Sequence, residues 1–287
     1  MSQDPLRLAR PAVPPAYTIA AVDRAIALLE LLADHPHAGV TQLAKLAGST
    51  KSQVFRLLHT LERRRFVRKD NAQRSYALGL GALLLGERAR LHTDLIRLAQ
   101  GHLDALADAT RENIYLTIRD GLSAVCVDMR HSPQPLRLYA EVGRAAPLHV
   151  GGGPKLLLAF APDEVIEAVL KRPLTRFTNR TEVSAASLRR ALAAIRQAGA
   201  NESHGDLDSD AFSFAAPVRD LGGGVIAALS IAGPNSRLTQ AAATRYRALV
   251  ASHASALSRE LGAPPVVTPP GAPIQLATAT RAKGRRS

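Results

Sequence analysis

The sequence has 287 residues, 46% of them hydrophobic and 21% charged, which fits about two globular domains that can each bury a core. Lysine and arginine number 37 against 24 aspartates and glutamates, so the net charge of +13 indicates an acidic partner such as nucleic acid. The single cysteine excludes a disulfide framework and a zinc finger, and no apolar run is long enough for a secretory signal or a membrane span. We therefore expect a cytoplasmic protein with no membrane partner, no cofactor and no metal.

The charge is concentrated at the two ends of the chain. Residues 1–90 carry 14 basic and 7 acidic side chains, whereas residues 91–261 carry 19 and 17, and residues 262–287 carry four basic side chains and no acidic one. This asymmetry favours a nucleic-acid module at the N-terminus, followed by an almost neutral globular domain. The proline-rich segments 1–16 and 263–287 are expected to be disordered tails.

The first predicted helix begins near Val22 and ends before Pro36. Its apolar stripe at helical spacing consists of Val22, Ile26, Leu29 and Ala33. A second, short helix is expected after Thr41, whose side chain suits an N-cap. Gly48 can end this helix in the left-handed conformation.

A third helix begins at Thr50, which has capping-box spacing to Gln53. Its predicted buried stripe is Val54, Leu57, Leu58 and Leu61. The opposite, polar stripe is Gln53, Arg56, Thr60 and Arg63. Two short helices about three residues apart, the second with a basic outer face, are typical of a helix-turn-helix.

Two strand-like runs, residues 66–69 and 74–78, follow this helix and predict a hairpin with a basic tip. The hairpin completes a winged helix-turn-helix over residues 17–78, whose second helix would enter the major groove of double-stranded DNA. We expect base contacts from Ser52, Gln53 and Arg56. The residues expected to contact phosphate are Thr50, Lys51, His59, Lys69 and Arg74. Thr60, on the polar stripe, completes the predicted DNA-binding set.

Residues 78–98 are predicted to form one helix. Its first part, residues 77–86, is apolar and uncharged, so either its own domain or a partner subunit must cover it. A linker with little core of its own favours the partner subunit. Residues 79–97 are therefore predicted to be a linker and dimerisation helix.

Residues 98–262 alternate helix and strand signals, and the expected second domain is α+β with an antiparallel sheet. Asp120-Gly121 and Gly222-Gly223-Gly224 mark two hairpins. The expected strands are residues 113–118, 123–129, 136–142, 212–218 and 225–231. The expected helices run to residue 110 and over residues 155–161, 163–172, 184–198 and 239–261.

A candidate ligand site is the segment Gly151 to Lys155, where glycines leave backbone N–H groups uncovered. Pro154 can take the first helical position, and such a helix N-terminus attracts a carboxylate or phosphate. A tight turn that packs against the sheet is the alternative interpretation. The sequence does not fit a phosphate-binding P-loop, because no Lys-Ser or Lys-Thr pair ends the glycine run.

Four segments of the chain, residues 21–67, 74–79, 143–160 and 214–239, resemble the IclR family of bacterial transcriptional regulators. The resemblance spans roughly residues 17–260. It implies an N-terminal winged helix-turn-helix, a linker helix used in dimerisation and a C-terminal effector-binding domain of GAF-like α+β fold. It also implies a homodimer, or a dimer of dimers, at promoters of small-molecule catabolism genes.

The resemblance also implies the effector site, beside the glycine segment and the final hairpin. The positions carried over are Leu138, Ala146, Gly152, Gly153, Ala211, Ser213 and Ser230. Small and hydroxyl side chains there suit a small organic acid. Phe212 and Phe214 could line this site or, by strand alternation, face the core. The chain departs from the family pattern at Arg65 and Pro154, where glycine is usual, and at Asp206, where glutamate is common.

Two further features are given a structural interpretation. Asp206, Asp208 and Asp210 have the spacing at which an EF-hand opens, but Ala211 replaces the required glycine, so we expect a solvated loop. Cys126 lies in a predicted strand and is expected to be a small buried hydrophobic residue.

Three functions remain to be compared. The first is a DNA-binding transcriptional regulator whose promoter binding responds to a small organic acid through a shift between two conformations. The second is a hydrolase using His149 or His204, although no motif such as G-x-S-x-G supports it. The third is a non-specific architectural nucleic-acid-binding protein that uses both basic ends of the chain. The sequence leaves open which acid is bound and whether the protein represses or activates transcription.

Overall fold

The computed structural model describes residues 18–264 except 92–93, 137 and 139–140. The first predicted tail, and all but the first two residues of the second, lie outside the described residues. By contacts the described chain divides into two units, one up to Arg97 and one from Leu98 onwards. Within the described part, no helix is both long and apolar enough to cross a membrane.

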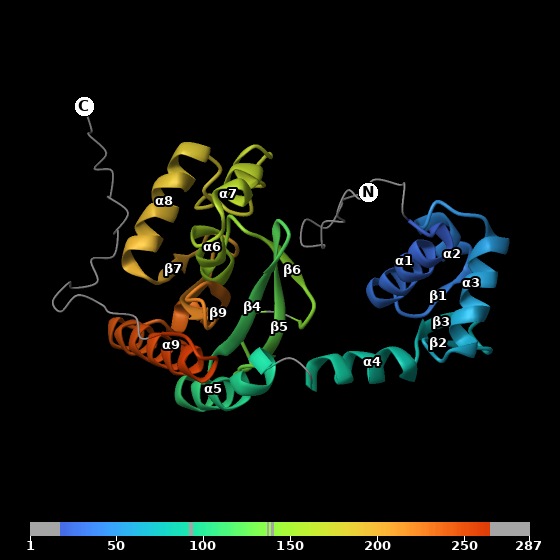
Figure 1. The fold of residues 1–287 in the computed structure, drawn as a ribbon, viewed down its shortest axis with the longest axis horizontal. Coiled ribbons are helices and arrows are strands. Elements are labelled where there is room, and N and C mark those ends of the chain that lie inside the picture. Colours follow the sequence, from blue (N-terminus) through green and yellow to red (C-terminus); the bar gives the residue numbers. More distant parts are fainter. Residues whose placement is uncertain (1–17, 92–93, 137, 139–140, 265–287) are drawn as a thin grey trace. The chain divides into compact units, whose positions relative to one another are not determined.

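The N-terminal unit is a winged helix-turn-helix (Figure 1). Its helices are α1 (Ala20–Asp34), α2 (Val40–Leu46) and α3 (Lys51–Arg63). Its antiparallel sheet has the order β1 (Ala38–Gly39), β3 (Ser75–Leu78), β2 (Val67–Asp70). This arrangement confirms the predicted class of the unit.

The core of this unit forms between α1, α2, α3 and β3. Its buried members include Leu28, Leu31 and Leu32 of α1, Leu43 of α2, Val54 and Leu58 of α3, and Tyr76 of β3. The helical spacing of the apolar stripe is confirmed, but most of this stripe is not the buried one: Val22 and Ile26 are 52% and 53% exposed, and Leu29 packs against the core. Helix α1 is apolar around much of its circumference, so two stripes have helical spacing, and the leucine-rich stripe packs inward.

The helix caps of this unit are partly as predicted. The Thr50 side chain accepts a hydrogen bond from the Gln53 N–H and so caps α3. Gly48 has the predicted left-handed backbone, with φ +58°. The N-cap prediction for Thr41 is wrong, because α2 begins at Val40, two residues earlier than a helix capped by Thr41 would, and Gly39 occupies the N-cap position.

Arg65 turns the chain between α3 and β2 with φ +63°, a left-handed conformation that costs a residue with a side chain about 1 kcal/mol or more. We expect Arg65→Gly to raise the free energy of unfolding by about 0.5–1 kcal/mol, because glycine has no Cβ penalty there. Thermal unfolding followed by circular dichroism measures the shift. The matched control is Arg64→Gly at φ −85°, where glycine should lower the melting temperature. A lower melting temperature for Arg65→Gly would contradict the strain argument.

The predicted single helix over residues 78–98 is wrong at its boundaries. Leu78 ends strand β3, and the structure has two helices, α4 (Leu80–Leu91) and α5 (Asp94–Thr110), with residues 92–93 outside the described part. Helix α5 belongs mostly to the second unit. The leucines of α4 that remain largely exposed are Leu80, Leu83, Leu84 and Leu85.

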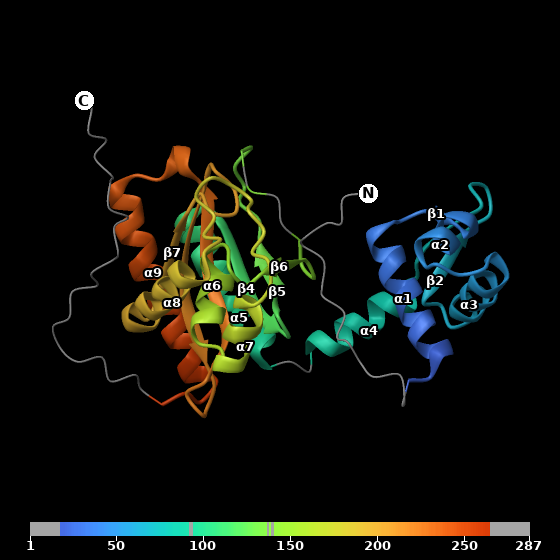
Figure 2. The same cartoon turned by 90° about the horizontal axis from the view of Figure 1, so that it is seen from above.

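The second unit contains a six-stranded antiparallel sheet in the order β6-β5-β4-β9-β8-β7 (Figure 2). The strands are β4 (Asn113–Asp120), β5 (Ser123–Arg130), β6 (Ala145–Pro147), β7 (Asn201–His204), β8 (Ala211–Arg219) and β9 (Val225–Pro234). Both predicted hairpins are confirmed, β4–β5 and β8–β9. The strand predicted over 136–142 is wrong for its described residues Leu136, Leu138, Glu141 and Val142, which belong to no strand; residues 137 and 139–140 lie outside the described part.

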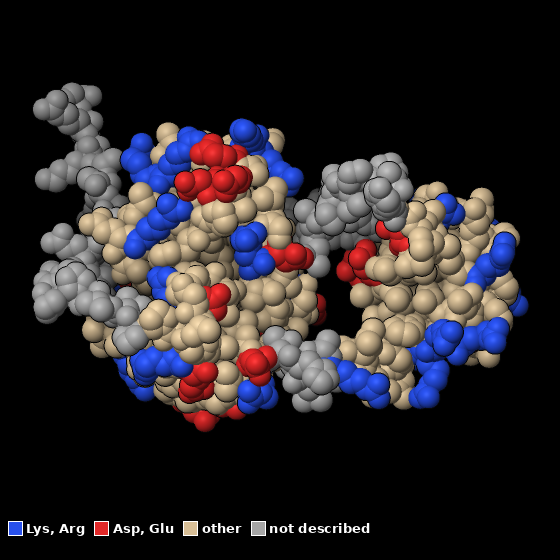
Figure 3. Space-filling view, in the orientation of Figure 1, with Lys and Arg blue, Asp and Glu red and all other residues tan. Residues whose placement is uncertain are grey.

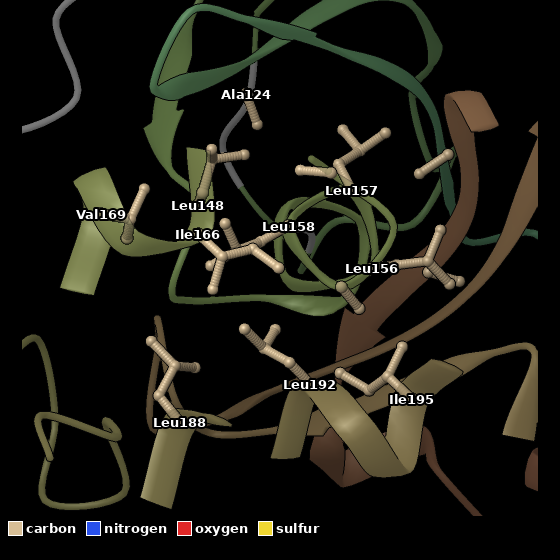
Figure 4. Packing of buried hydrophobic residues seen from close by; sticks show 14 residues of the cluster. Ala124, Leu148, Leu156, Leu157, Leu158, Ile166, Val169, Leu188, Leu192 and Ile195 are labelled. Carbon is tan, nitrogen blue, oxygen red and sulfur yellow. The ribbon is translucent and has the colours of Figure 1, made fainter. Parts of the chain in front are cut away.

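Helices cover both faces of this sheet. Helices α6 (Gly152–Ala159), α7 (Asp163–Leu170) and α8 (Ala185–Ala198) form a core cluster on one face, in which Leu156 to Leu158 pack with Ile166, Val169, Leu188, Leu192 and Ile195 (Figure 4). On the other face α9 (Gln240–Glu260) packs against β8. The rings of Phe212 and Phe214 point to this face and contact Tyr246 of α9, so both rings pack in the core, and Phe212 also lines the cavity described below.

Helix α6 starts earlier than predicted. It begins at Gly152, after Gly151 in a positive-φ conformation (+78°), so Pro154 occupies the third helical position and not the first. The glycines therefore form the first turn of the helix itself. This first turn lies against the sheet, because α6 contacts both β8 and β9.

Candidate functional site

The outward face of α3 carries the predicted DNA-binding side chains. The side chains of Lys51, Ser52, Gln53, Arg56, His59 and Thr60 are all exposed, as is the cap residue Thr50. Besides the Thr50 cap, two of them make hydrogen bonds within the unit. The Thr60 hydroxyl donates to the Arg56 carbonyl at 2.9 Å, and the Gln53 side-chain oxygen accepts from the Ser49 hydroxyl at 2.8 Å.

The wing is the β2–β3 hairpin. The Asp70 carboxylate accepts from the backbone N–H groups of Ala72 and Gln73, which fixes the turn. Lys69 and Arg74 stand exposed on either side of it. Figure 3 shows lysine and arginine gathered over α3 and this hairpin. Arg68 of β2 is also exposed, and sequence reasoning did not name it among the DNA contacts.

The second unit encloses a cavity of about 460 Å³ between the first turn of α6 and the sheet. All seven positions named from the resemblance lie in its wall: Leu138, Ala146, Gly152, Gly153, Ala211, Ser213 and Ser230. Their assignment to an effector stays a prediction, since no ligand contact tests it. The wall also includes Tyr115, Thr117, Cys126, Arg144 and Ser203, which sequence reasoning missed.

The two glycines of α6 make room for hydroxyl groups. A Cβ atom on Gly152 would stand 2.4 Å from the Ser213 hydroxyl oxygen, and one on Gly153 would stand 2.9 Å from the Ser230 hydroxyl oxygen. Ser230 is 3% exposed, and its hydroxyl has no hydrogen-bond partner among the described residues. The N–H groups of a first helical turn also have no acceptor within the helix. Unsatisfied donors thus converge on one end of the cavity.

A buried ion pair stands beside this end. The Lys155 Nζ lies 2.5 Å from an Asp206 carboxylate oxygen, and the other carboxylate oxygen accepts from the Gly151 N–H at 3.1 Å and from the Ser203 hydroxyl. Burial alone raises the pKa of Asp206, but Lys155 and these hydrogen bonds outweigh it and hold the pKa below its ordinary value. The solvated-loop prediction is therefore wrong for Asp206, whereas Asp208 is exposed.

The reactive side chains near the cavity are not activated for catalysis. Burial raises the pKa of the Cys126 thiol to about 12, so it stays protonated, and it is half-buried in the cavity wall instead of fully buried as predicted. Burial lowers the pKa of His149, whose Nε2 lies 2.9 Å from the Thr175 carbonyl oxygen. As far as described residues define it, the wall contains no histidine, so nothing in its geometry supports the hydrolase hypothesis.

A winged helix-turn-helix joined to an α+β unit with a small-molecule cavity defines a ligand-binding transcriptional regulator. Comparison with known families agrees. Residues 21–71 match the IclR helix-turn-helix domain, and residues 88–259 match the bacterial transcriptional regulator IclR C-terminal domain. The chain belongs to the IclR family of DNA-binding transcriptional regulators, which carry a C-terminal effector-binding domain and are not enzymes.

Individual relatives support this assignment. The chain is 30% identical to the HTH-type transcriptional regulator KdgR of Escherichia coli (strain K12), over 85% of this chain and 94% of that protein. The solved IclR transcriptional regulator from Alicyclobacillus acidocaldarius matches with a TM-score of 0.80 at 26% identity, covering 86% of this chain and all of that one. An IclR homologue from Microbacterium hydrocarbonoxydans, solved with 4-hydroxybenzoate, has the same fold, with a TM-score of 0.77 at 23% identity over 84% and 98% of the chains.

Proposed function

We propose that the chain binds operator DNA through α3 and that a small organic acid in the cavity controls this binding. The observation that carries the ligand proposal is the unpartnered Ser230 hydroxyl beside the first turn of α6. A carboxylate would accept from this hydroxyl and from the N–H groups of Gly152 and Gly153. A cavity of about 460 Å³ has room for a small organic acid. One structural neighbour was solved with such an acid, 4-hydroxybenzoate.

On the DNA side, Ser52, Gln53 and Arg56 are proposed to contact base edges. The proposed phosphate contacts are Thr50, Lys51, His59, Lys69 and Arg74. Base contacts carry sequence specificity, whereas phosphate contacts add affinity on any sequence. Thr60 lies on the same face, but its hydroxyl is already bonded to the Arg56 carbonyl, so we assign it a supporting contact.

This division predicts different defects for Arg56→Ala and Lys69→Ala. Loss of a base contact should weaken binding to the operator about 10- to 100-fold and leave binding to scrambled DNA nearly unchanged. Loss of a phosphate contact should weaken binding to both duplexes by a similar factor. It should also reduce the slope of log affinity against log salt concentration by about one. Fluorescence-anisotropy titrations at two salt concentrations measure both quantities. Equal loss on both duplexes for Arg56→Ala would remove it from the base-contacting set.

The start of α4 is joined to the turn after the recognition helix through backbone hydrogen bonds. The Gly79 N–H donates to the Phe66 carbonyl and the Gly81 N–H to the Arg65 carbonyl, at 2.8 and 2.7 Å. A Cβ on Gly79 would stand 2.4 Å from the Arg65 carbonyl oxygen. Because α4 is fastened in this way to the turn that follows α3, a displacement of α4 moves the recognition helix with it.

We also propose that the chain acts as a homodimer, or as a dimer of dimers, through the linker over residues 79–97. The four exposed leucines of α4 support this proposal, because large apolar side chains left in water favour a partner that covers them. The winged helix over residues 17–78 and the effector-binding domain over residues 98–262 would then act as paired units on two half-sites.

One titration tests the proposed function. Full-length protein is titrated against the duplex upstream of its own gene and a scrambled duplex, with and without 4-hydroxybenzoate, a panel of small aliphatic and aromatic acids, and their amides. We expect selective binding that one acid changes and its amide does not. Ser230→Ala should weaken that response, and Ser209→Ala, an exposed serine outside the cavity wall, should not. Equal binding to both duplexes, indifferent to every acid, would instead support the architectural hypothesis.

A further inference from the structure

One exposed side chain of α3 is apolar, although the side chains proposed to contact DNA are all polar or charged. Phe55 is 51% exposed in α3. The other apolar side chains of this helix, Val54, Leu57, Leu58 and Leu61, are buried or half-buried against the unit's core. An aromatic ring left half in water on a short helix loses the free energy that its burial would supply.

The position of Phe55 is on the side of α3 assigned to DNA. It lies four residues after Lys51 and four before His59, and helical geometry places residues four apart on one face. The ring thus stands in the N-terminal half of the helix, the part that a helix-turn-helix inserts between the phosphate backbones.

The major groove offers one apolar group that could cover such a ring, the C5-methyl group of thymine. Cytosine, adenine and guanine present mainly hydrogen-bonding atoms there, and a phenyl ring has no N–H or O–H donor and no oxygen or nitrogen acceptor to pair with them. We propose that Phe55 is a specificity-determining residue that contacts a thymine methyl group in each operator half-site. This inference rests on the proposed function, since it requires α3 to enter the major groove.

The test removes the methyl group from the DNA and the ring from the protein. Operator sequences are first selected from random duplexes with the full-length wild-type chain. Each thymine of the consensus is then replaced singly by deoxyuridine, which differs only by lacking the methyl group. Dissociation constants are measured by anisotropy for wild type, Phe55→Ala, Phe55→Leu and Leu221→Ala. Leu221 is an exposed apolar residue of the other unit and serves as the matched control.

We expect one thymine per half-site at which deoxyuridine weakens wild-type binding about three- to fivefold, the amount for one buried methyl group. Leu221→Ala should keep this sensitivity, Phe55→Leu should keep part of it, and Phe55→Ala should lose it. Circular dichroism verifies folding of each variant, and Phe55→Leu keeps the test decisive if Phe55→Ala is unstable.

Other results would overturn the inference. If wild type tolerates deoxyuridine at every position, or if Phe55→Ala remains as sensitive as wild type, the ring does not contact a thymine methyl group. A Phe55→Ala variant that keeps this sensitivity but changes oligomeric state would place the ring against a second protein chain. If selection yields no consensus, the proposed function fails together with this inference, whereas a consensus with uniform tolerance of deoxyuridine refutes the inference alone.

Discussion

Replacing Arg237 with alanine is expected to destabilise the second unit by about 3–5 kcal/mol. Glu112 is 2% exposed. The Arg237 guanidinium donates a hydrogen bond to each oxygen of its carboxylate, at 2.8 and 2.5 Å. Removing the guanidinium would leave a buried charge without its partner, which costs far more than an exposed pair is worth. Gly233 leaves the room that this carboxylate occupies, because a Cβ there would stand 2.4 Å from a Glu112 carboxylate oxygen.

The same arginine also supports the cavity. Its Nη1 donates to the Leu136 carbonyl at 2.7 Å, and Asn113 donates to the Leu138 carbonyl at 2.9 Å. Leu138 lines the cavity, and these two bonds fix the backbone at Leu136 and Leu138. We therefore expect Arg237→Ala to weaken ligand binding as well as stability.

Urea unfolding of the full-length chain by circular dichroism measures the loss, and hydrogen exchange of peptides from β4 and β9 assigns it to the second unit. The added variant Glu112→Gln should recover at least about 1 kcal/mol, since a neutral amide tolerates the missing partner better. Arg189→Ala, which breaks the exposed pair with Glu167, is the matched control and should leave the midpoint unchanged. An equally small effect of Arg237→Ala would refute the buried-charge argument.

Local chemistry explains which elements of the N-terminal unit could be predicted. The Thr50 cap and the left-handed Gly48 depend on neighbouring residues alone, and both are as predicted. The stripe of α1 depends on which leucines meet α3 and β3, and this information is absent from its spacing. Val22 and Ile26 are therefore exposed although their period is helical.

In the second unit the two hairpins could be predicted because glycine-rich turns mark them. Strands β6 and β7 could not, since they have three and four residues and pair at the edges of the sheet. The seven cavity positions were named from the resemblance and lie together, but their chemistry depends on pairings over long distances in the sequence. Lys155 and Asp206 are one such pair, which no local pattern indicates.

That pair gives a second large effect: Asp206→Asn is expected to cost about 3–5 kcal/mol near neutral pH. The substitution keeps an oxygen that can accept from the Gly151 N–H and the Ser203 hydroxyl, but it leaves the Lys155 ammonium, only 13% exposed, without a counter-ion. Asp208→Asn, two residues further along the same loop and exposed, is the matched control and should leave the midpoint unchanged.

The pH dependence separates this charge effect from a packing defect. The pKa of Asp206 in the folded chain lies below its ordinary value of 3.8, so its contribution is fully present above that value and is lost as the pH falls through the folded pKa. The difference in unfolding free energy between wild type and Asp206→Asn should thus be constant from pH 7 to about 5 and shrink below pH 3.8. Urea unfolding at intervals from pH 7 to 3, with hydrogen exchange of α6 peptides, follows it. A difference that stays constant to pH 3 would mean that lost packing, not the ion pair, destabilises the variant.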